Sequence, residues 1–287
     1  MKKTFDGMYY KHQKGIRTVA IIAGISAGCH AFIQVITNSN SYDFNYPPSV
    51  YESYNSGETV RIGDSVFSKD GVKIRIVSQE KSLSICGDII YSGITPLRYD
   101  IMGPFKYLPM QCRHRVSSLY HRLDGSLTVN GENIDFTGGT GYIEGDSGTS
   151  FPKSYMWIQC GDFIDCQDKA CIMASAADIP FAGLHFCGCI CVVYINGTEY
   201  RLATYLGAKV ILCDENHIII KQGKLRLEIE INTDDADTGH KLAAPEKGEM
   251  VREIYERIAC GARFKFTRGG EVLFDKRSET TSFEYLN

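Results

Sequence analysis

Two carboxylate side chains, Glu144 and Asp146, lie two residues apart in a glycine-rich stretch of the chain. In an extended backbone alternate residues share one face, so the two carboxyl groups would lie side by side. Neighbouring carboxyl groups usually separate their pKa values, and one of them can stay protonated near neutral pH. This pair is therefore our candidate for a general acid that protonates an alkene or another weak base. The alternative for residues 145–148 is a turn, in which the Asp side chain bonds its own backbone.

Two histidines in an arginine-rich segment, residues 111–122, form a second candidate site. His114 and His121 could orient or deprotonate a hydroxyl group at the polar end of a pocket. The alternative is a solvated loop in which both histidines are satisfied. A zinc site drawing on His114, His121 and Cys112 lacks tight paired ligand spacing, so we expect no metal.

Other side chains that could do chemistry also have simpler interpretations. The single tryptophan, Trp157, either fills a core or stabilises a cationic intermediate through its ring face. Cys187, Cys189 and Cys191 alternate among apolar neighbours, which favours buried packing over soft-metal binding. Residues 145–148 match the surroundings of a serine-protease nucleophile, but those proteases carry an upstream Ala-Ala-His-Cys segment that this chain lacks. No glycine-rich phosphate loop opens a helix, and we expect no cofactor.

A sequence period of two dominates the chain and predicts β-strands. The segments that carry it are residues 31–37, 72–77, 83–91, 126–130, 156–160, 217–221 and 224–231. Turn signals such as those at 69–71 and 195–197 recur at short intervals. Residues 116–123 fit a strand or a short helix equally. Many short strands with frequent hairpins favour an all-β barrel or sandwich.

One helix is predicted near the C-terminus, over residues 246–258. Its apolar positions recur at helical spacing and include Ile254 and Ile258. Pro245 suits a first helical turn, and Gly261 follows the end of the segment.

Length and composition describe an ordinary globular chain. The 287 residues, 44% of them hydrophobic, can bury one large core or two medium ones. The predicted strands exceed what one eight-stranded barrel needs, so we expect two domains, residues 1–135 and 136–287. A net charge of -3 without a block of Lys or Arg argues against a nucleic-acid surface.

Cysteine usage and the N-terminal residues bear on the compartment. The 11 cysteines are an odd number and fall mostly in apolar runs, which favours reduced thiols over a disulfide framework. Residues 1–7 lack the apolar core of a signal peptide, so we expect a soluble, cytoplasmic protein.

Several blocks of the sequence, spread over nearly its whole length and in order, resemble the tocopherol cyclase family. The strongest block runs from Gly141 to Pro152 and continues into the strand that holds Trp157. The opening Phe5–Lys11 looks like the family's Phe-Glu-Gly-Trp-Tyr-Phe-Lys. The remaining blocks are Met102–Phe105 with Met110–His114, Ala177–Phe181 and Arg201–Lys209.

The resemblance implies an all-β fold of two lipocalin-like antiparallel β-barrel domains, to which the predicted C-terminal helix would be added. Similar proteins handle hydrophobic polyprenyl or polyketide substrates. The family's named activity closes a chromanol ring: an acid protonates the alkene of a prenylated hydroquinone, and the phenol oxygen captures the tertiary cation. That chemistry requires neither a redox cofactor nor a metal.

Carried onto this sequence, the resemblance implies that Glu144 or Asp146 is the general acid of an apolar pocket. The expected ligand-binding residues are Tyr142, Trp157, Gln159, His114, His121 and Tyr205. The expected partner is a hydrophobic small molecule, an isoprenoid or prenylated phenol, collected through transient contact with a membrane.

Two departures from the family pattern favour an alternative function. Met8 stands where the opening block usually has Trp, and Ser147 stands where the loop usually has an aromatic residue. The alternative is a lipocalin-like carrier or sensor of a hydrophobic ligand, without chemistry. A third interpretation is a structural protein whose interior is filled by its own side chains.

Overall fold

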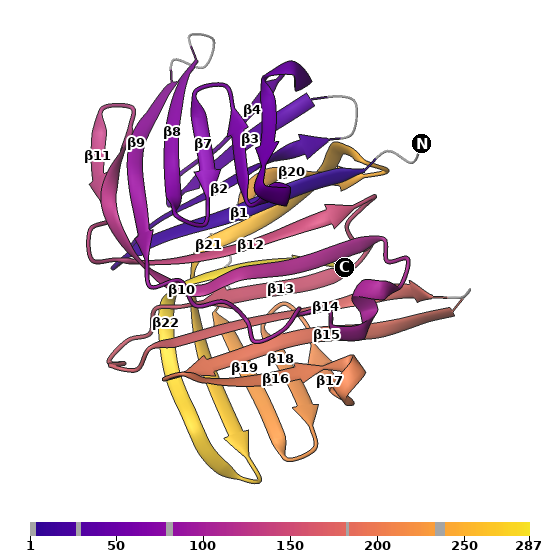
Figure 1. Ribbon diagram of the computed structural model, residues 1–287. Helices are drawn as coiled ribbons and strands as arrows, with labels where there is room; N and C mark the ends of the chain where they lie inside the picture. The colour runs from indigo at the N-terminus through magenta and orange to yellow at the C-terminus, as the bar shows by residue number, and fades with distance from the viewer. Residues whose placement is uncertain (1–3, 27–29, 79–82, 182–183, 233–238) are drawn as a thin grey trace. The chain divides into compact units, whose positions relative to one another are not determined.

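The structure, a computed structural model, describes residues 4–26, 30–78, 83–181, 184–232 and 239–287. Within these ranges the chain forms two antiparallel sheets and no α-helix (Figure 1). The helical segments described are four 3-10 turns: η1 (Pro48–Val50), η2 (Asn55–Gly57), η3 (Gly103–Tyr107) and η4 (Thr204–Leu206). None of them is long and apolar enough to cross a membrane. The predicted all-β class is confirmed.

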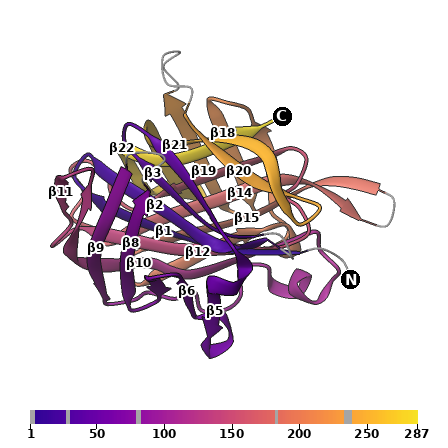
Figure 2. The same cartoon turned by 90° about the horizontal axis from the view of Figure 1, so that it is seen from above.

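The first sheet contains twelve strands in the described part of the chain. They are β1 (Phe5–Lys14), β2 (Arg17–Ser26), β3 (His30–Thr37), β4 (Ser41–Tyr46), β5 (Tyr51–Tyr54), β6 (Thr59–Ile62), β7 (Ser65–Ser68), β8 (Gly71–Ser78), β9 (Leu83–Ser92), β10 (Cys112–Val129), β11 (Glu132–Asp135) and β12 (Thr140–Gly148). Their order is β4-β3-β2-β1-β12-β10-β9-β8-β7-β6-β5, and β11 pairs with β10. Figure 2 shows β3, β2 and β1 following one another across this sheet. The late strand β12 is therefore inserted between the first strand and β10.

The second sheet contains ten strands in the described part of the chain. They are β13 (Tyr155–Cys160), β14 (Ala170–Phe181), β15 (Leu184–Ile195), β16 (Thr198–Ala203), β17 (Lys209–Cys213), β18 (His217–Gln222), β19 (Leu225–Asn232), β20 (His240–Glu246), β21 (Glu249–Arg268) and β22 (Glu271–Leu286). Their order is β16-β15-β14-β13-β22-β21-β19-β18-β17, and β20 pairs with β21. Residues 116–123, which fitted a strand or a helix, belong to the long strand β10 of the first sheet.

Both sheets curl without closing. In the first sheet β6 comes close to β2 and β3, and in the second β15 lies near β17 and β16 near β18. Strand twist and the bulges between β21 and β22 produce such curvature. The pairings recorded among the described residues leave each sheet open at two edge strands. Closure into the lipocalin-like barrels that we expected is not seen in them.

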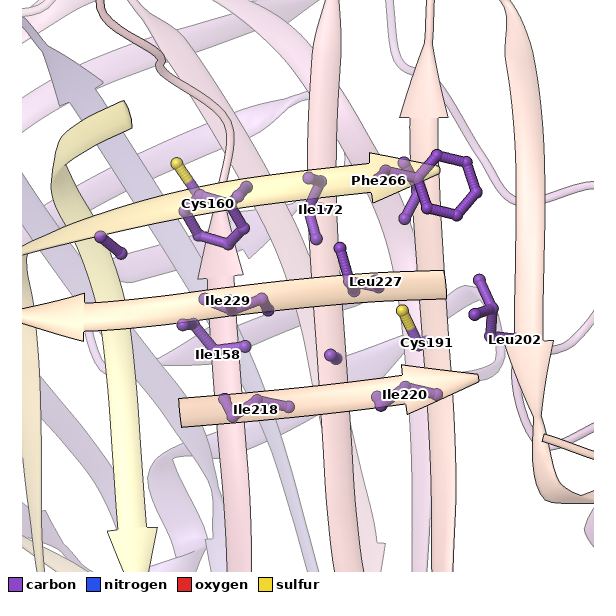
Figure 3. Close-up of a cluster of buried hydrophobic side chains, with 14 of the residues drawn as sticks. Ile158, Cys160, Ile172, Cys191, Leu202, Ile218, Ile220, Leu227, Ile229 and Phe266 are labelled. Carbon is purple, nitrogen blue, oxygen red and sulfur yellow. The ribbon is translucent and has the colours of Figure 1, made fainter. Parts of the chain in front are cut away.

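The chain divides into two compact units, each with its own apolar core. The first unit contains residues 1–97, 114–150 and 243–252, and the second contains residues 98–113, 151–242 and 253–287. The first core is built from side chains such as Tyr10, Val19, Ile21, Ile33, Val35, Phe67, Ile74, Ile85, Leu127 and Ile143. The second includes Ile158, Cys160, Ile172, Cys191, Leu202, Ile218, Ile220, Leu227, Ile229 and Phe266 (Figure 3). Each buried aliphatic side chain stabilises the fold by roughly 2 kcal/mol. The division at residues 135 and 136 stays a prediction.

The cysteines of the described ranges are thiols. Cys189 and Cys191 are buried in the second core, whereas Cys187 is exposed, so buried packing is wrong for Cys187. Burial is the largest cause that raises the pKa of the Cys189 and Cys191 thiols. Their predicted role as small packing residues fits this environment.

The predicted helix over residues 246–258 is wrong. The segment forms the end of β20, a two-residue hairpin turn and the first half of β21. Lys247 and Gly248 make the turn with φ values of 52° and 83°. Two successive residues with positive φ are typical of the turns that match the twist of a β-hairpin.

The helix prediction failed because the spacing of the apolar residues in this segment fits a helix and a strand alike. Ile254 and Ile258 are four residues apart, and side chains at that spacing share a face in a helix and in a strand alike. Both are buried, and so is Glu256 midway between them, at 0% exposure. In a helix Glu256 would turn away from that face, so a buried residue at every second position identifies a strand.

Candidate active site

Strand β12 presents the two candidate carboxylates on one face of the first sheet. It pairs with β1 without interruption, from Gln13 opposite Thr140 to Phe5 opposite Gly148. The alternative of a turn at residues 145–148 is therefore wrong, because these residues continue the strand. Ile143 points into the first core. Alternation along the strand then places Tyr142, Glu144 and Asp146 on the opposite face.

His114, on the neighbouring strand β10, lies between the two carboxylates. Its Nδ1 is 3.1 Å from Oδ1 of Asp146, at hydrogen-bond geometry. Its Nε2 is 3.3 Å from Oε2 of Glu144, close enough for an ion pair but without hydrogen-bond geometry. The Tyr142 hydroxyl donates to the same Glu144 oxygen at 2.5 Å. The four side chains thus form a continuous chain of polar contacts, Tyr142–Glu144–His114–Asp146.

The two carboxylates keep His114 protonated. Burial, the largest single influence, would lower the pKa of this imidazole, but Asp146 and Glu144 together outweigh it and hold the pKa well above the ordinary value. The side chain of His114 is only 11% exposed, and those of Glu144 and Asp146 are 7% and 24% exposed. His114 is therefore an imidazolium near neutral pH, shielded from water and held between two negative charges.

His114, Glu144 and Asp146 are also the only group of His, Cys, Asp and Glu in the described residues with three donor atoms close enough for one ion, within 4.8 Å of one another. Both imidazole nitrogens already face carboxylates, so an ion would have to displace the His114 proton. The geometry fits an imidazolium held by two carboxylates, and we identify none of the three as a metal ligand.

His121 belongs to a different cluster, on the core side of the same strands. Its ring is 4.3 Å from that of Tyr91, and a Cβ on Gly141 would lie 2.1 Å from its Nε2. The hydroxyl oxygen of Tyr91 in turn lies 2.6 Å from Nε2 of His12. Burial lowers the pKa of His121 to about 3 and that of His12 to about 4, so both rings are neutral. The structure therefore does not bring His121 to His114, and the alternative of a solvated loop is wrong for both.

Arg115, which the sequence did not single out, supports the two strands from the core side. It pairs with Asp6, and its Nε and Nη2 lie 3.1 and 3.0 Å from the sulfur of Met8. A Cβ on Gly145 would meet the same sulfur at 2.4 Å and the backbone carbonyl oxygen of Gly7, which cannot move aside, at 2.7 Å. Glycine is therefore required between the two carboxylates. The departure at Met8 was the one sequence signal for this cluster.

Trp157 and Gln159 lie together on β13 of the second sheet. Their neighbours Met156, Ile158 and Cys160 are in the second core, so Trp157 and Gln159 are on the opposite face. They are nevertheless only 6% and 1% exposed. Trp157 is thus buried without belonging to that core, and its ligand-binding role stays a prediction.

Tyr205 lies in η4, in a network that fastens the segment before β10. Its hydroxyl donates to the carbonyl of Ile101 at 2.9 Å and accepts from Nη1 of Arg201 at 3.2 Å. Arg201 also donates to the backbone of Tyr99 and Asp100 and lies 4.2 Å from the Tyr99 ring centre. The hydrogen bonds that the structure records for Tyr205 hold the segment around Ile101 in place. The ligand-binding role of Tyr205 stays a prediction.

Fold and site together define an all-β protein with a largely shielded cluster of a histidine and two carboxylates on one strand pair. A family model described as tocopherol cyclase-like matches residues 117–284, more than half of the chain. The chain belongs to the tocopherol cyclase-like family. The matched range includes Tyr142, Glu144 and Asp146, and it begins three residues after His114.

Solved structures of low sequence identity share the fold. Kievitone hydratase from Nectria haematococca superimposes with a TM-score of 0.55 at 12% identity, over 99% of this chain and 88% of that chain. CghA, solved with Sch210972, gives a TM-score of 0.57 at 8% identity, over 99% of this chain and 89% of that chain. At such identities the likeness establishes the fold alone.

Proposed function

We propose that this protein catalyses the acid-dependent addition of an oxygen nucleophile to a carbon–carbon double bond of an apolar substrate. The observation that carries the proposal is the 3.3 Å contact between Glu144 and Nε2 of His114, an imidazole that is 11% exposed and whose pKa the two neighbouring carboxylates raise. Membership of a tocopherol cyclase-like family supports it, as does the fold shared with a kievitone hydratase. Cyclase and hydratase chemistry differ in the oxygen, which belongs to the substrate in the first and to water in the second.

The cluster can supply and recover one proton. His114 gives its Nε2 proton to Glu144, so an N–H bond breaks as an O–H bond forms. Glu144 passes that proton to one carbon of the double bond and leaves a cation on the other carbon. The oxygen nucleophile bonds to the cation, and its own proton goes to Nε2 of His114, which restores the imidazolium. Proton transfer by positioned groups of this kind accelerates a reaction by roughly 10²- to 10⁴-fold.

The substrate class follows from the surroundings that we assign to the site. A carbocation needs a water-poor environment and aromatic faces, and we assign Tyr142, which contacts Glu144, to that role. His121 would act only through packing, and the ligand-binding roles of Trp157, Gln159 and Tyr205 in the second unit stay predictions. We infer a prenylated phenol or related isoprenoid as substrate, bound in an apolar pocket and collected from a membrane surface.

The test is incubation of the full chain with a panel of prenylated hydroquinones and polyprenyl alkenes in D₂O and, separately, in H₂¹⁸O. Mass spectrometry should find one deuterium on carbon in every product, and ¹⁸O only in products of hydration. Glu144→Gln and His114→Asn should each reduce turnover by about 100-fold or more. His217→Asn, an exposed histidine of the second sheet, is the matched control and should keep full turnover.

Recovery of every substrate unaltered, with saturable binding, would replace this proposal by the carrier function. The departures at Met8 and Ser147 are the observations that favour a carrier. Full turnover in Glu144→Gln would remove the acid role from this cluster.

A further inference from the structure

The two nitrogens of His114 are held differently. Nδ1 makes a hydrogen bond to Asp146 at 3.1 Å, whereas Nε2 faces Glu144 at 3.3 Å without hydrogen-bond geometry. The ring is therefore fixed from its Nδ1 side. The Nε2 proton is the one left in a position to move.

The strand pair that carries this contact is fixed from its other face. Arg115 follows His114 in β10, and it contacts Met8 of β1. Met8 in turn fills the space beneath Gly145, which separates Glu144 from Asp146 in β12. Side chains at consecutive positions point to opposite faces of a sheet. The packing of Arg115 and Met8 therefore holds the two strands together on the face opposite the Asp146–His114 contact.

We propose that Asp146 is a positioning residue that holds His114 in the one orientation from which Nε2 exchanges its proton with Glu144, and that keeps the proton of the neutral ring on Nδ1. The catalytic role of Asp146 in this inference rests on the proposed function. The orientation of His114 by Asp146 does not. A carboxylate that accepts from Nδ1–H fixes which imidazole nitrogen is available for proton transfer. Asp146 itself neither gains nor loses the proton that reaches the substrate.

The charged groups that act on His114 are few. Asp146 and Glu144, both from β12, are the two charges that raise its pKa. On β1, Tyr9 pairs with Glu144 and Lys11 pairs with Tyr142, so both occupy the same face of the sheet. Removing the Asp146 charge should therefore lower the pH at which His114 loses its proton, by about one unit or more.

The experiment is a pH titration of the full chain labelled with ¹⁵N-histidine, followed by nuclear magnetic resonance, with the His114 signal assigned by its loss in His114→Asn. In the unaltered protein His114 should deprotonate to the Nδ1–H tautomer alone. In Asp146→Asn it should titrate at lower pH and populate both tautomers, and Asp146→Glu should restore the higher titration. Asp135→Asn, which removes an exposed carboxylate paired with Lys14, should change neither property.

Kinetics separate this role from a structural one. Asp146→Asn should lower kcat by about 100-fold or more while KM changes less than about twofold, and the alkaline limb of the pH–rate profile should move to lower pH. An unchanged titration and tautomer of His114 in Asp146→Asn would overturn the inference, whatever the turnover. A changed tautomer in a protein that converts no substrate would leave the orientation in place and remove the proposed function instead.

Discussion

At the scale of single residues, the absence of one methyl group at Gly141 lets the His121 ring lie in the first core. A Cβ there would come within 2.1 Å of Nε2, and the ring has no room to retreat because Tyr91 lies against it at 4.3 Å. We expect Gly141→Ala to lower the free energy of unfolding by about 1–3 kcal/mol, the usual cost of overpacking a core. Urea denaturation followed by circular dichroism measures the change.

Gly161→Ala is the matched control for that substitution. A Cβ at Gly161 would meet only Nε2 of Gln159, at the ordinary contact distance of 3.5 Å. Its unfolding midpoint should stay within error of the unaltered protein. Equal stability of the two variants would mean that the His121 ring can move aside and that the first core is looser than its packing indicates.

At the scale of elements, one substitution at Gly248 distinguishes a hairpin from a helix, because the change in stability has the opposite sign in the two structures. In a helix, Gly248→Ala would raise stability by about 1 kcal/mol. In the observed turn Gly248 has a φ of 83°, and we expect the same change to lower stability by about 1–2 kcal/mol because a side chain is strained there. Chemical denaturation of both proteins measures the sign.

Lys247→Asn should act in the opposite direction. Lys247 has a φ of 52°, and Asn is far better suited than Lys to this position of a hairpin turn. The substitution should stabilise the protein by up to about 1 kcal/mol. A loss of stability in Lys247→Asn together with a gain in Gly248→Ala would contradict the hairpin.

At the scale of the whole molecule, two neutral histidines buried in the first unit should make the fold sensitive to acid. Burial lowers the pKa of His12 to about 4 and that of His121 to about 3, whereas both return to about 6.5 on unfolding. Their stabilising effect is complete above pH 6.5 and is lost as pH falls toward 4 and 3, because only the unfolded chain binds the protons. At pH 5 the loss is about 2 kcal/mol for each histidine.

Comparison of denaturation at pH 7.5 and pH 5.0 tests this expectation. His114 acts in the opposite sense, since its raised pKa gives stability that is complete below pH 6.5 and is lost as pH rises through the folded value. The informative quantity is therefore the difference between variants. His12→Gln should reduce the acid-induced loss by about 2 kcal/mol, and an unchanged loss would show that His12 is not the neutral, buried group described above.

The sequence by itself determined the fold class and the pair of carboxylates. Alternation with a period of two reports directly on strands, because successive side chains face opposite sides of a sheet. For the same reason, the separation of two residues is enough to place Glu144 and Asp146 on one face of a strand. The blocks that resemble the tocopherol cyclase family also pointed to the family that the match over residues 117–284 establishes.

Only the tertiary structure decided which histidine joins those carboxylates and what the C-terminal segment becomes. His114 reaches Asp146 across 32 positions of sequence, because β10 and β12 are neighbours in the sheet, while His121 of the same strand turns to the core. Local spacing carries no information about which distant strands pair. The spacing of Ile254 and Ile258 fits a helix and a strand equally. The segment is a strand because β21 pairs with its neighbours, and this pairing exists only in the folded sheet.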